Sequence, residues 1–119
     1  MQQQEPRLSV SVEDGVSVVR FVDEKILDEM SISEIGRQLE ALVNEASRPR
    51  MVLDFSGVSH MSSSALGMLI TLHKHVREKD GDLRLASIQP EIYEVFVITR
   101  LNDVFRIHDA VSEALESLT

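Results

Sequence analysis

The hydrophobic positions of the chain change their spacing several times, and each spacing predicts a type of element. Leu8, Val10 and Val12 alternate with polar residues, and residues 16–22 are rich in β-branched side chains, with an Asp-Gly pair at residues 14–15 between the two runs. Alternation with a period of two around an Asp-Gly pair predicts a β-hairpin. We therefore expect the chain to open with two antiparallel strands.

From Ser31 onward the apolar residues fall at helical spacing, and they predict a first helix as far as Ala46. Ser31 and Glu34 have the spacing of a capping box, so we place the start of this helix at Ser31, and Pro49 closes it. The same spacing predicts three more helices: one from about Ser63 to residues 79–81, one that starts at Pro90, and one over residues 111–118.

Three further strands lie between these helices. Met51–Phe55 is nearly all apolar, which is typical of a strand covered on both faces in a parallel sheet, so we expect it to be central. Leu83–Ala86 and Phe105–Ile107 are the other two. The order ββαβαβαβα predicts an α/β fold with a mixed, mostly parallel β-sheet, an N-terminal β-hairpin and about four α-helices. We expect residues 1–6 to be a flexible N-terminus and residues 7–119 to form a single domain.

Composition narrows the classes of partner. A chain of 119 residues corresponds to one ordinary domain, and a net charge of -8 disfavours nucleic acids and anionic membranes, which attract clustered Lys and Arg. The chain has no cysteine, it contains no apolar run near the roughly 18 residues of a membrane span, and its N-terminus lacks the pattern of a signal peptide. We expect a cytoplasmic location.

Motifs of enzymes and metal sites are missing from the sequence. It contains no Walker-type loop, no GxGxxG, no HExxH and no GxSxG. His73 and His75 are two residues apart on a predicted helix, so they point to different faces and are poorly placed to share a metal ion. We therefore expect a binding protein without a metal or cofactor, and no enzyme.

One segment stands out, because residues 54–67 carry five serines and an aspartate just after the central strand. In open α/β sheets, sites form at the carboxyl ends of the strands. Ser62 or Ser63 is a candidate N-cap of the following helix. A hydroxyl in its first turn is equally well placed to accept a phosphoryl group. Spacing alone does not choose between these two roles.

The stretches Leu53-Asp54-Phe55-Ser56-Gly57-Val58 and Met61-Ser62-Ser63-Ser64-Ala65-Leu66-Gly67 resemble the signature of the STAS domain, which occurs in anti-sigma factor antagonists and sulphate transporters. The resemblance covers most of the chain and implies a STAS-like fold over residues 7–119. It also implies a regulatory role, in which the antagonist binds an anti-sigma factor, often a serine kinase, and thereby frees the sigma factor. Phosphorylation of a serine blocks this binding, and a phosphatase, here expected to be of the PP2C type, restores it.

On this resemblance Ser64 is the phosphoacceptor. Ser62 and Ala65 stand where the family has Asp and Gly, so the acidic neighbour of the acceptor is absent. The flexible thioethers of Met61 and Met68 suit adaptable interfaces. Asp23 follows the second strand and is expected at the same edge as the serines. The residues that we expect to contact the partner are Asp23, Ser56, Met61, Ser62, Ser63, Ala65 and Met68.

Two other functions stay open. In the first, the chain is a scaffold subunit that is never phosphorylated and assembles with other regulators or with itself; a homodimer is one form of such an assembly. The changes at Ser62 and Ala65 favour this hypothesis. In the second, which is weaker because no phosphate-binding loop is present, the domain senses a nucleotide.

Overall fold

The computed structural model describes residues 7–119, and the predicted flexible N-terminus of residues 1–6 lies outside the described residues. The elements of the described part are β1 (Leu8–Glu13), β2 (Val16–Phe21), β3 (Lys25–Ile26), α1 (Glu29–Glu45), β4 (Arg50–Asp54), β5 (His60–Met61), α2 (Ser63–Glu78), β6 (Asp82–Ala86), α3 (Pro90–Ile98), the 3-10 helix η1 (Leu101–Asp103), β7 (Arg106–His108) and α4 (Val111–Leu118).

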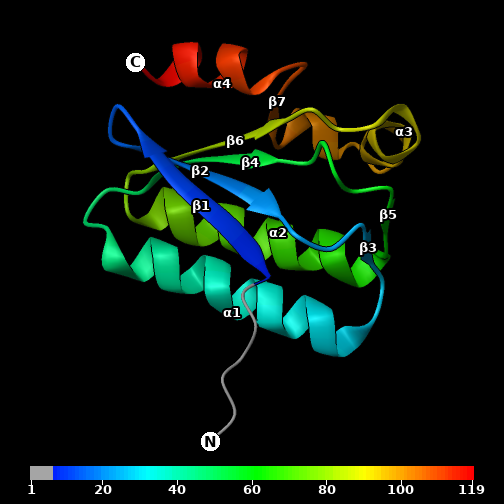
Figure 1. Ribbon diagram of the computed structural model, residues 1–119. Coiled ribbons are helices and arrows are strands. Elements are labelled where there is room, and N and C mark those ends of the chain that lie inside the picture. Colours follow the sequence, from blue (N-terminus) through cyan, green and yellow to red (C-terminus); the bar gives the residue numbers. More distant parts are fainter. Residues whose placement is uncertain (1–6) are drawn as a thin grey trace, which may run out of the picture.

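Five strands form the main sheet in the order β1-β2-β4-β6-β7. β1 and β2 are antiparallel, and every other neighbouring pair in this sheet is parallel. Helices α1 and α2 cover one face of the sheet, and α4 lies across the other face (Figure 1). These features confirm the predicted α/β fold, with its N-terminal hairpin and mostly parallel sheet.

The turn of the hairpin follows from its two residues. Asp14 has φ 52° and Gly15 has φ 79°, and a two-residue hairpin turn with positive φ at both positions is of type I′. Glu13 then faces Val16, and Leu8 faces Phe21 at the far end of the ladder. The Asp-Gly pair thus sets the register of the first two strands.

Strand β4 is the centre of the domain, as its apolar sequence predicts. Met51 and Leu53 pack into the main core between the sheet and helices α1 and α2, whereas Val52 packs on the opposite face with residues of α4. All three side chains are almost fully buried. A strand with apolar residues on both faces is what two covering layers require.

The start of α1 corrects the sequence prediction. The helix begins at Glu29 and its N-cap is Asp28, whose Oδ2 accepts a hydrogen bond from the Ser31 amide at 3.0 Å. This bond holds the pKa of the Asp28 carboxyl below its usual 3.8. Ser31 lies inside the helix and is buried, so the capping box predicted at Ser31 and Glu34 is wrong.

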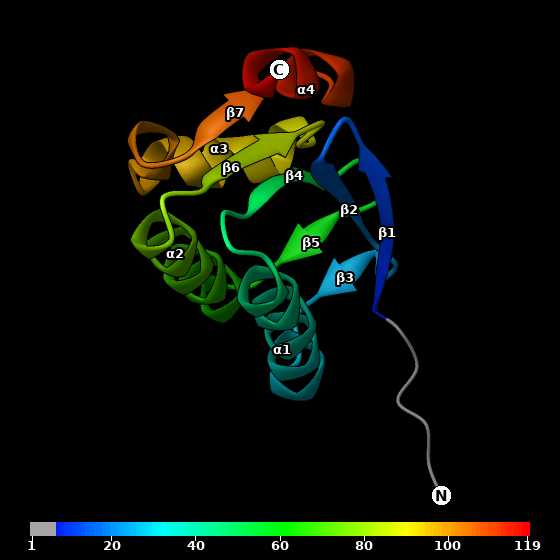
Figure 2. The same cartoon turned by 90° about the vertical axis from the view of Figure 1, so that its left-hand side faces the viewer.

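Two short strands were not predicted. β3 and β5 have two residues each and pair in parallel as a separate two-stranded sheet. They lie beyond the carboxyl ends of β2 and β4, where Figure 2 shows them side by side above α1. None of the helices in residues 7–119 is long and apolar enough to cross a membrane.

Candidate functional site

The three serines of the 62–64 run take different positions at the start of α2. Ser62 is the N-cap, and its Oγ accepts a hydrogen bond from the Ala65 amide at 3.2 Å. Ser63 and Ser64 are the first two residues of the helix, and both are exposed. Neither hydroxyl has a hydrogen-bond partner within the described part of the chain. Capping therefore occupies Ser62 and leaves the hydroxyl of Ser64 free.

The short sheet fixes this helix start against the rest of the domain. Ile26 pairs with Met61, and the Ser62 amide donates to the Ile26 carbonyl at 3.1 Å. The Ser59 amide donates to the Glu24 carbonyl at 2.8 Å. The chain after β2 and the chain before α2 are thus joined by backbone hydrogen bonds at one edge of the domain.

Asp23 lies directly before this junction. Its two carboxylate oxygens accept from Nη1 of Arg7 at 3.0 and 3.1 Å. The ion pair is partly exposed, and it neutralises much of the charge that Asp23 would present to a partner.

Ser56 belongs to the loop after β4, whose shape depends on Asp54. The Asp54 Oδ1 accepts from the Ser56 amide at 2.9 Å, a hydrogen bond between residues two apart that is typical of an Asx turn. The Ser56 carbonyl accepts from Gln89 at 3.4 Å, and the residue itself is exposed. The aspartate therefore shapes the loop and holds its serine at the surface.

The other predicted contact residues are less accessible. Met61 and Met68 are half-buried and pack against the main core. A Cβ added at Gly36 of α1 would lie 3.2 Å from Cγ of Met68, so this thioether fills the space between α1 and α2. Ala65 is fully buried, and its methyl group lies beneath the surface rather than in it.

Apolar side chains flank the serines on two sides, and the sequence pattern did not reveal them. Leu27 and Met30, next to the N-terminus of α1, are 49% and 76% exposed. On the side of α3, Val95 is 41% exposed and lines a pocket together with Leu66 of α2. This pocket, of about 180 Å³, lies between β5, α2 and α3 and is lined by Ser59, His60, Met61, Leu66, Glu91, Ile92 and Val95.

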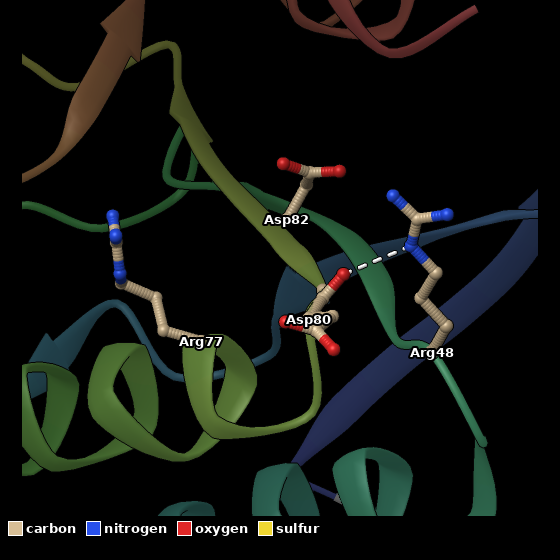
Figure 3. A pocket seen from close by; sticks show the side chains of 5 residues that line it. Arg48, Arg77, Asp80 and Asp82 are labelled. Atoms are coloured by element: carbon tan, nitrogen blue, oxygen red, sulfur yellow. Dashed lines mark hydrogen bonds between the residues drawn. The ribbon is translucent and has the colours of Figure 1, made fainter.

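A second hollow, of about 560 Å³, lies at the opposite end of the strands, where α2 ends and β6 begins (Figure 3). Arg48 donates through Nε to the carbonyl of Asp80 at 2.9 Å, and Arg77 and Asp82 also line the hollow. Its mixture of two arginines and two aspartates favours neither anions nor cations. No serine of residues 7–119 lines this hollow.

The histidines of α2 point to different faces, as predicted. His75 meets Glu40 of α1 with Nδ1 2.7 Å from Oε2, whereas the ring of His73 packs edge-on against Phe105 at 5.2 Å. Residues 7–119 contain no group of three His, Cys, Asp or Glu side chains that could hold a metal ion.

The chain is similar to several known proteins. The chain is 24% identical over 104 residues to the anti-sigma F factor antagonist of Paenibacillus polymyxa, covering 87% of each chain. A solved anti-sigma-factor antagonist (STAS) domain protein from Planctomyces limnophilus superposes with a TM-score of 0.84 at 26% identity, covering 92% of this chain and 96% of that one. The Bacillus cell fate determinant SpoIIAA, solved in its phosphorylated form, has the same fold, with a TM-score of 0.72 at 16% identity over 94% and 99% of the two chains.

Fold and similarity together define a small α/β domain that resembles anti-sigma factor antagonists. The chain belongs to the STAS domain family, whose model matches residues 7–114.

Proposed function

We propose that this domain binds an anti-sigma factor of the serine-kinase type, and that phosphorylation of Ser64 ends the binding. One observation carries the proposal: Ser64 is exposed at the N-terminus of α2, with its hydroxyl free of partners in residues 7–119 and apolar side chains nearby. Support comes from the relative named as an anti-sigma F factor antagonist and from the fold shared with a protein solved in a phosphorylated form.

The proposed contact surface centres on Ser63 and Ser64. Leu27 and Met30 border it on one side, and α3 borders it on the other. Burying exposed apolar surface contributes about 25 cal/mol per Å², so these side chains supply the binding energy while the serines supply the control. Asp23 and Ser56 lie at the rim of this surface.

Phosphorylation acts on this surface through charge. Transfer of the γ-phosphoryl group of ATP to Oγ of Ser64 releases ADP and the hydroxyl proton and adds roughly -1.5 to -2 charges. The free amides and partial positive charge of the helix N-terminus tolerate the phosphate, so the domain stays folded. Burying the same charge under a partner costs a few kcal/mol, which weakens binding on the order of 100-fold.

The two departures from the family pattern leave this mechanism possible. Ser and Asp are both good N-caps, so Ser62 keeps the cap that an aspartate would provide and loses only its charge. The methyl group of Ala65 is buried and does not obstruct the approach of a partner. The acceptor serine thus keeps its position and exposure.

Incubation with ATP and the kinase-type anti-sigma factors of the host, followed by peptide mass spectrometry, tests the proposal. We expect phosphate on Ser64, none in S64A, and normal labelling in S112A, the matched control, which removes an exposed serine from the first turn of α4. Isothermal titration with the same kinases should show binding to the wild type and roughly 100-fold weaker binding to S64E. The absence of phosphate from Ser64 with every cognate kinase would refute the switch, and a PP2C-type phosphatase should remove the phosphate where it forms.

The uncharged residue at position 62 favours a second candidate, the scaffold subunit that is never phosphorylated. For a scaffold, S64A and S64E should bind and assemble as the wild type does, as measured by size-exclusion chromatography with light scattering. A nucleotide sensor is less favoured, because the pocket of about 180 Å³ beside the serines is smaller than the range of about 300–1,000 Å³ typical of ligand sites.

A further inference from the structure

Strand β1 has a free edge that the proposed function does not use. It is the last strand of the main sheet, and its outer side pairs with no other strand of residues 7–119 (Figure 2). Residues 9–13 are exposed, with Val10 at 44% and Val12 at 69%. The strand contains no Lys, Pro or bulge, the features that usually protect such an edge from pairing.

The hydrogen bonds to β2 show which backbone groups of β1 point outward. The Val22 amide donates to the Arg7 carbonyl at 2.9 Å, so this carbonyl points toward β2, whereas the Arg7 amide donates to Oε1 of Gln38. Glu13 and Val16 flank the two-residue turn and form the hydrogen-bonded pair that closes it. In an antiparallel ladder such pairs alternate, so every second residue of β1 directs its amide and carbonyl toward β2. The backbone groups of Leu8, Val10 and Val12 therefore point away from the sheet, where a second strand would meet them.

We propose that two copies of this chain pair antiparallel through β1, with Val10 opposite Val10 of the second copy. In this register the outward backbone amides and carbonyls of one β1 strand lie opposite those of the other. The two five-stranded sheets then join into one. In this register Leu8 faces Val12 of the second copy, and Ser9 faces its Ser11. Apolar residues meet on the face that carries α1 and α2, and serines meet on the other face.

Cross-strand charge pairing favours the register centred on Val10 over the neighbouring register, which is centred on Ser11. Arg7 faces Glu13 of the second copy, so the strand pair ends in one ion pair on each side. Centring the pair on Ser11 instead would place Leu8 opposite Asp14, and Glu13 would lose its arginine. Cross-strand pairs of opposite charge stabilise a sheet, whereas an apolar residue opposite an acid contributes little.

Both charged groups are available for this contact. Arg7 uses Nη1 for Asp23, which leaves the N–H groups on Nη2 and Nε for an acceptor in the second copy. Glu13 is exposed and makes no ion pair with any residue of the described part. The ends of the strand are thus complementary to each other: Glu13 has no ion-pair partner in residues 7–119, and Arg7 keeps free donors beside its ion pair with Asp23.

The proposed dimer leaves the serine site open. The free edge of β1 runs along the side of the sheet, whereas Ser64 lies at the N-terminus of α2. Pairing and partner binding are therefore separate properties, and either can fail without the other. One strand pair is a small interface, so we expect a weak dimer whose population depends on concentration.

Sedimentation velocity of the full chain over a concentration series, up to about 1 mM, tests the pairing. We expect wild-type dimers and a dimer Kd raised at least about tenfold in V10K, because the substitution places two lysines opposite each other. V104K is the matched control, since Val104 is 43% exposed and lies away from the edge. A wild type that is monomeric throughout, or a dimer that V10K leaves unchanged, would overturn the proposal.

Cross-linking tests the register, since the chain contains no cysteine of its own. Val10 would form a hydrogen-bonded pair with Val10 of the second copy, and the Cα atoms of such a pair are about 5.5 Å apart. This spacing is within the range of a disulfide, so V10C should form a dimer on mild oxidation. V12C is more exposed, but its two cysteines would be separated by four residues of strand, about 13 Å, and should stay reduced. Equal cross-linking of V10C and V12C would show random collision and contradict the register.

Discussion

Ser62 holds the N-terminus of α2 through one hydrogen bond, from the Ala65 amide to its Oγ at 3.2 Å. Removing an N-cap oxygen leaves that amide without its acceptor, so we expect S62A to lower the free energy of unfolding by about 1 kcal/mol. Urea denaturation followed by circular dichroism measures this change. S63A is the control: Ser63 caps nothing, and its substitution should change stability by less than about 0.5 kcal/mol.

An aspartate at the same position separates the role of the cap from that of the charge. S62D keeps an acceptor oxygen and adds a negative charge at the positive end of the helix, so its stability should equal or exceed that of the wild type. A loss of stability in S62D as large as that in S62A would show that packing around the hydroxyl, and not capping, determines the effect.

His73 should make stability depend on pH. Burial chiefly, and the charge of Arg77 in addition, lower the pKa of the imidazole below its usual value of 6.5. As the pH falls below about 6.5, the unfolded chain takes up a proton that the folded domain binds less readily, so stability contributed by neutral His73 is lost. Above that pH the contribution is complete.

The variant H73F tests this dependence, because it keeps a ring against Phe105 and cannot be protonated. Between pH 7 and 5 its free energy of unfolding should fall less than that of the wild type in urea titrations. Parallel curves for the two proteins would contradict the role assigned to His73.

The sequence indicated which types of residue could cap a helix, but it did not show which residue has that role. Ser62 and Ser63 were both candidates for the cap of α2, and the cap is Ser62. The cap of α1 was predicted at Ser31, but it is Asp28, three residues earlier. Local pattern fits both choices, and tertiary packing decides, as when it buries Ser31. The exposure of a side chain could not be predicted either, since nothing in the sequence distinguishes the exposed Met30 from a core methionine.

At the scale of elements, a glycine within α2 and a glycine just after it have opposite requirements. Gly67 lies at an exposed position in the first half of the helix with nothing within 4 Å of an added Cβ, so G67A should raise the free energy of unfolding by about 0.5–1 kcal/mol. Gly81 lies between α2 and β6, and an added Cβ would run into the carbonyl oxygen of Pro49. That carbonyl also accepts from the Asp82 amide at 2.9 Å, which restricts its movement.

We therefore expect G81A to lower the free energy of unfolding by about 1–3 kcal/mol, the usual cost of overpacking. Thermal and urea unfolding of both variants measure the contrast. A neutral G81A would mean that the connections before β4 and β6 separate easily, contrary to the close contact between them.

Elements with a strong period were predictable, and elements created by pairing were not. The hairpin, the central strand and the four helices each carry their own pattern, because burial of one face imposes a spacing. β3 and β5 have two residues each, too few to show a period, and they exist because Lys25–Ile26 and His60–Met61 meet in the folded chain. These two strands fix the site, so its framework could not be predicted from local sequence.

At the scale of the whole molecule, one sheet connects two cores of different size. The main core lies between the sheet and helices α1 and α2, and a smaller one lies under α4. The smaller core consists of Val16, Val52, Ala86, Ala114 and Leu118. Val52 belongs to the same strand as Met51 and Leu53 of the main core, so neither layer can separate without exposing the other side of β4.

Because the two cores share β4, we expect a single unfolding transition. Truncating a side chain should lower the free energy of unfolding more in the main core than in the smaller one. Leu39 is fully buried in the main core, and L39A should lower the free energy of unfolding by about 3 kcal/mol. L118A should lower it by about 1–2 kcal/mol, because Leu118 belongs to the smaller core and is 7% exposed. Both variants should shift the urea midpoint without changing the slope, since the domain unfolds as one unit. If α4 were independent, amide exchange in residues 111–118 would become fast in L118A while the main core stayed protected. We expect instead that protection of β4 falls together with that of α4, because Val52 loses its cover when Leu118 is truncated.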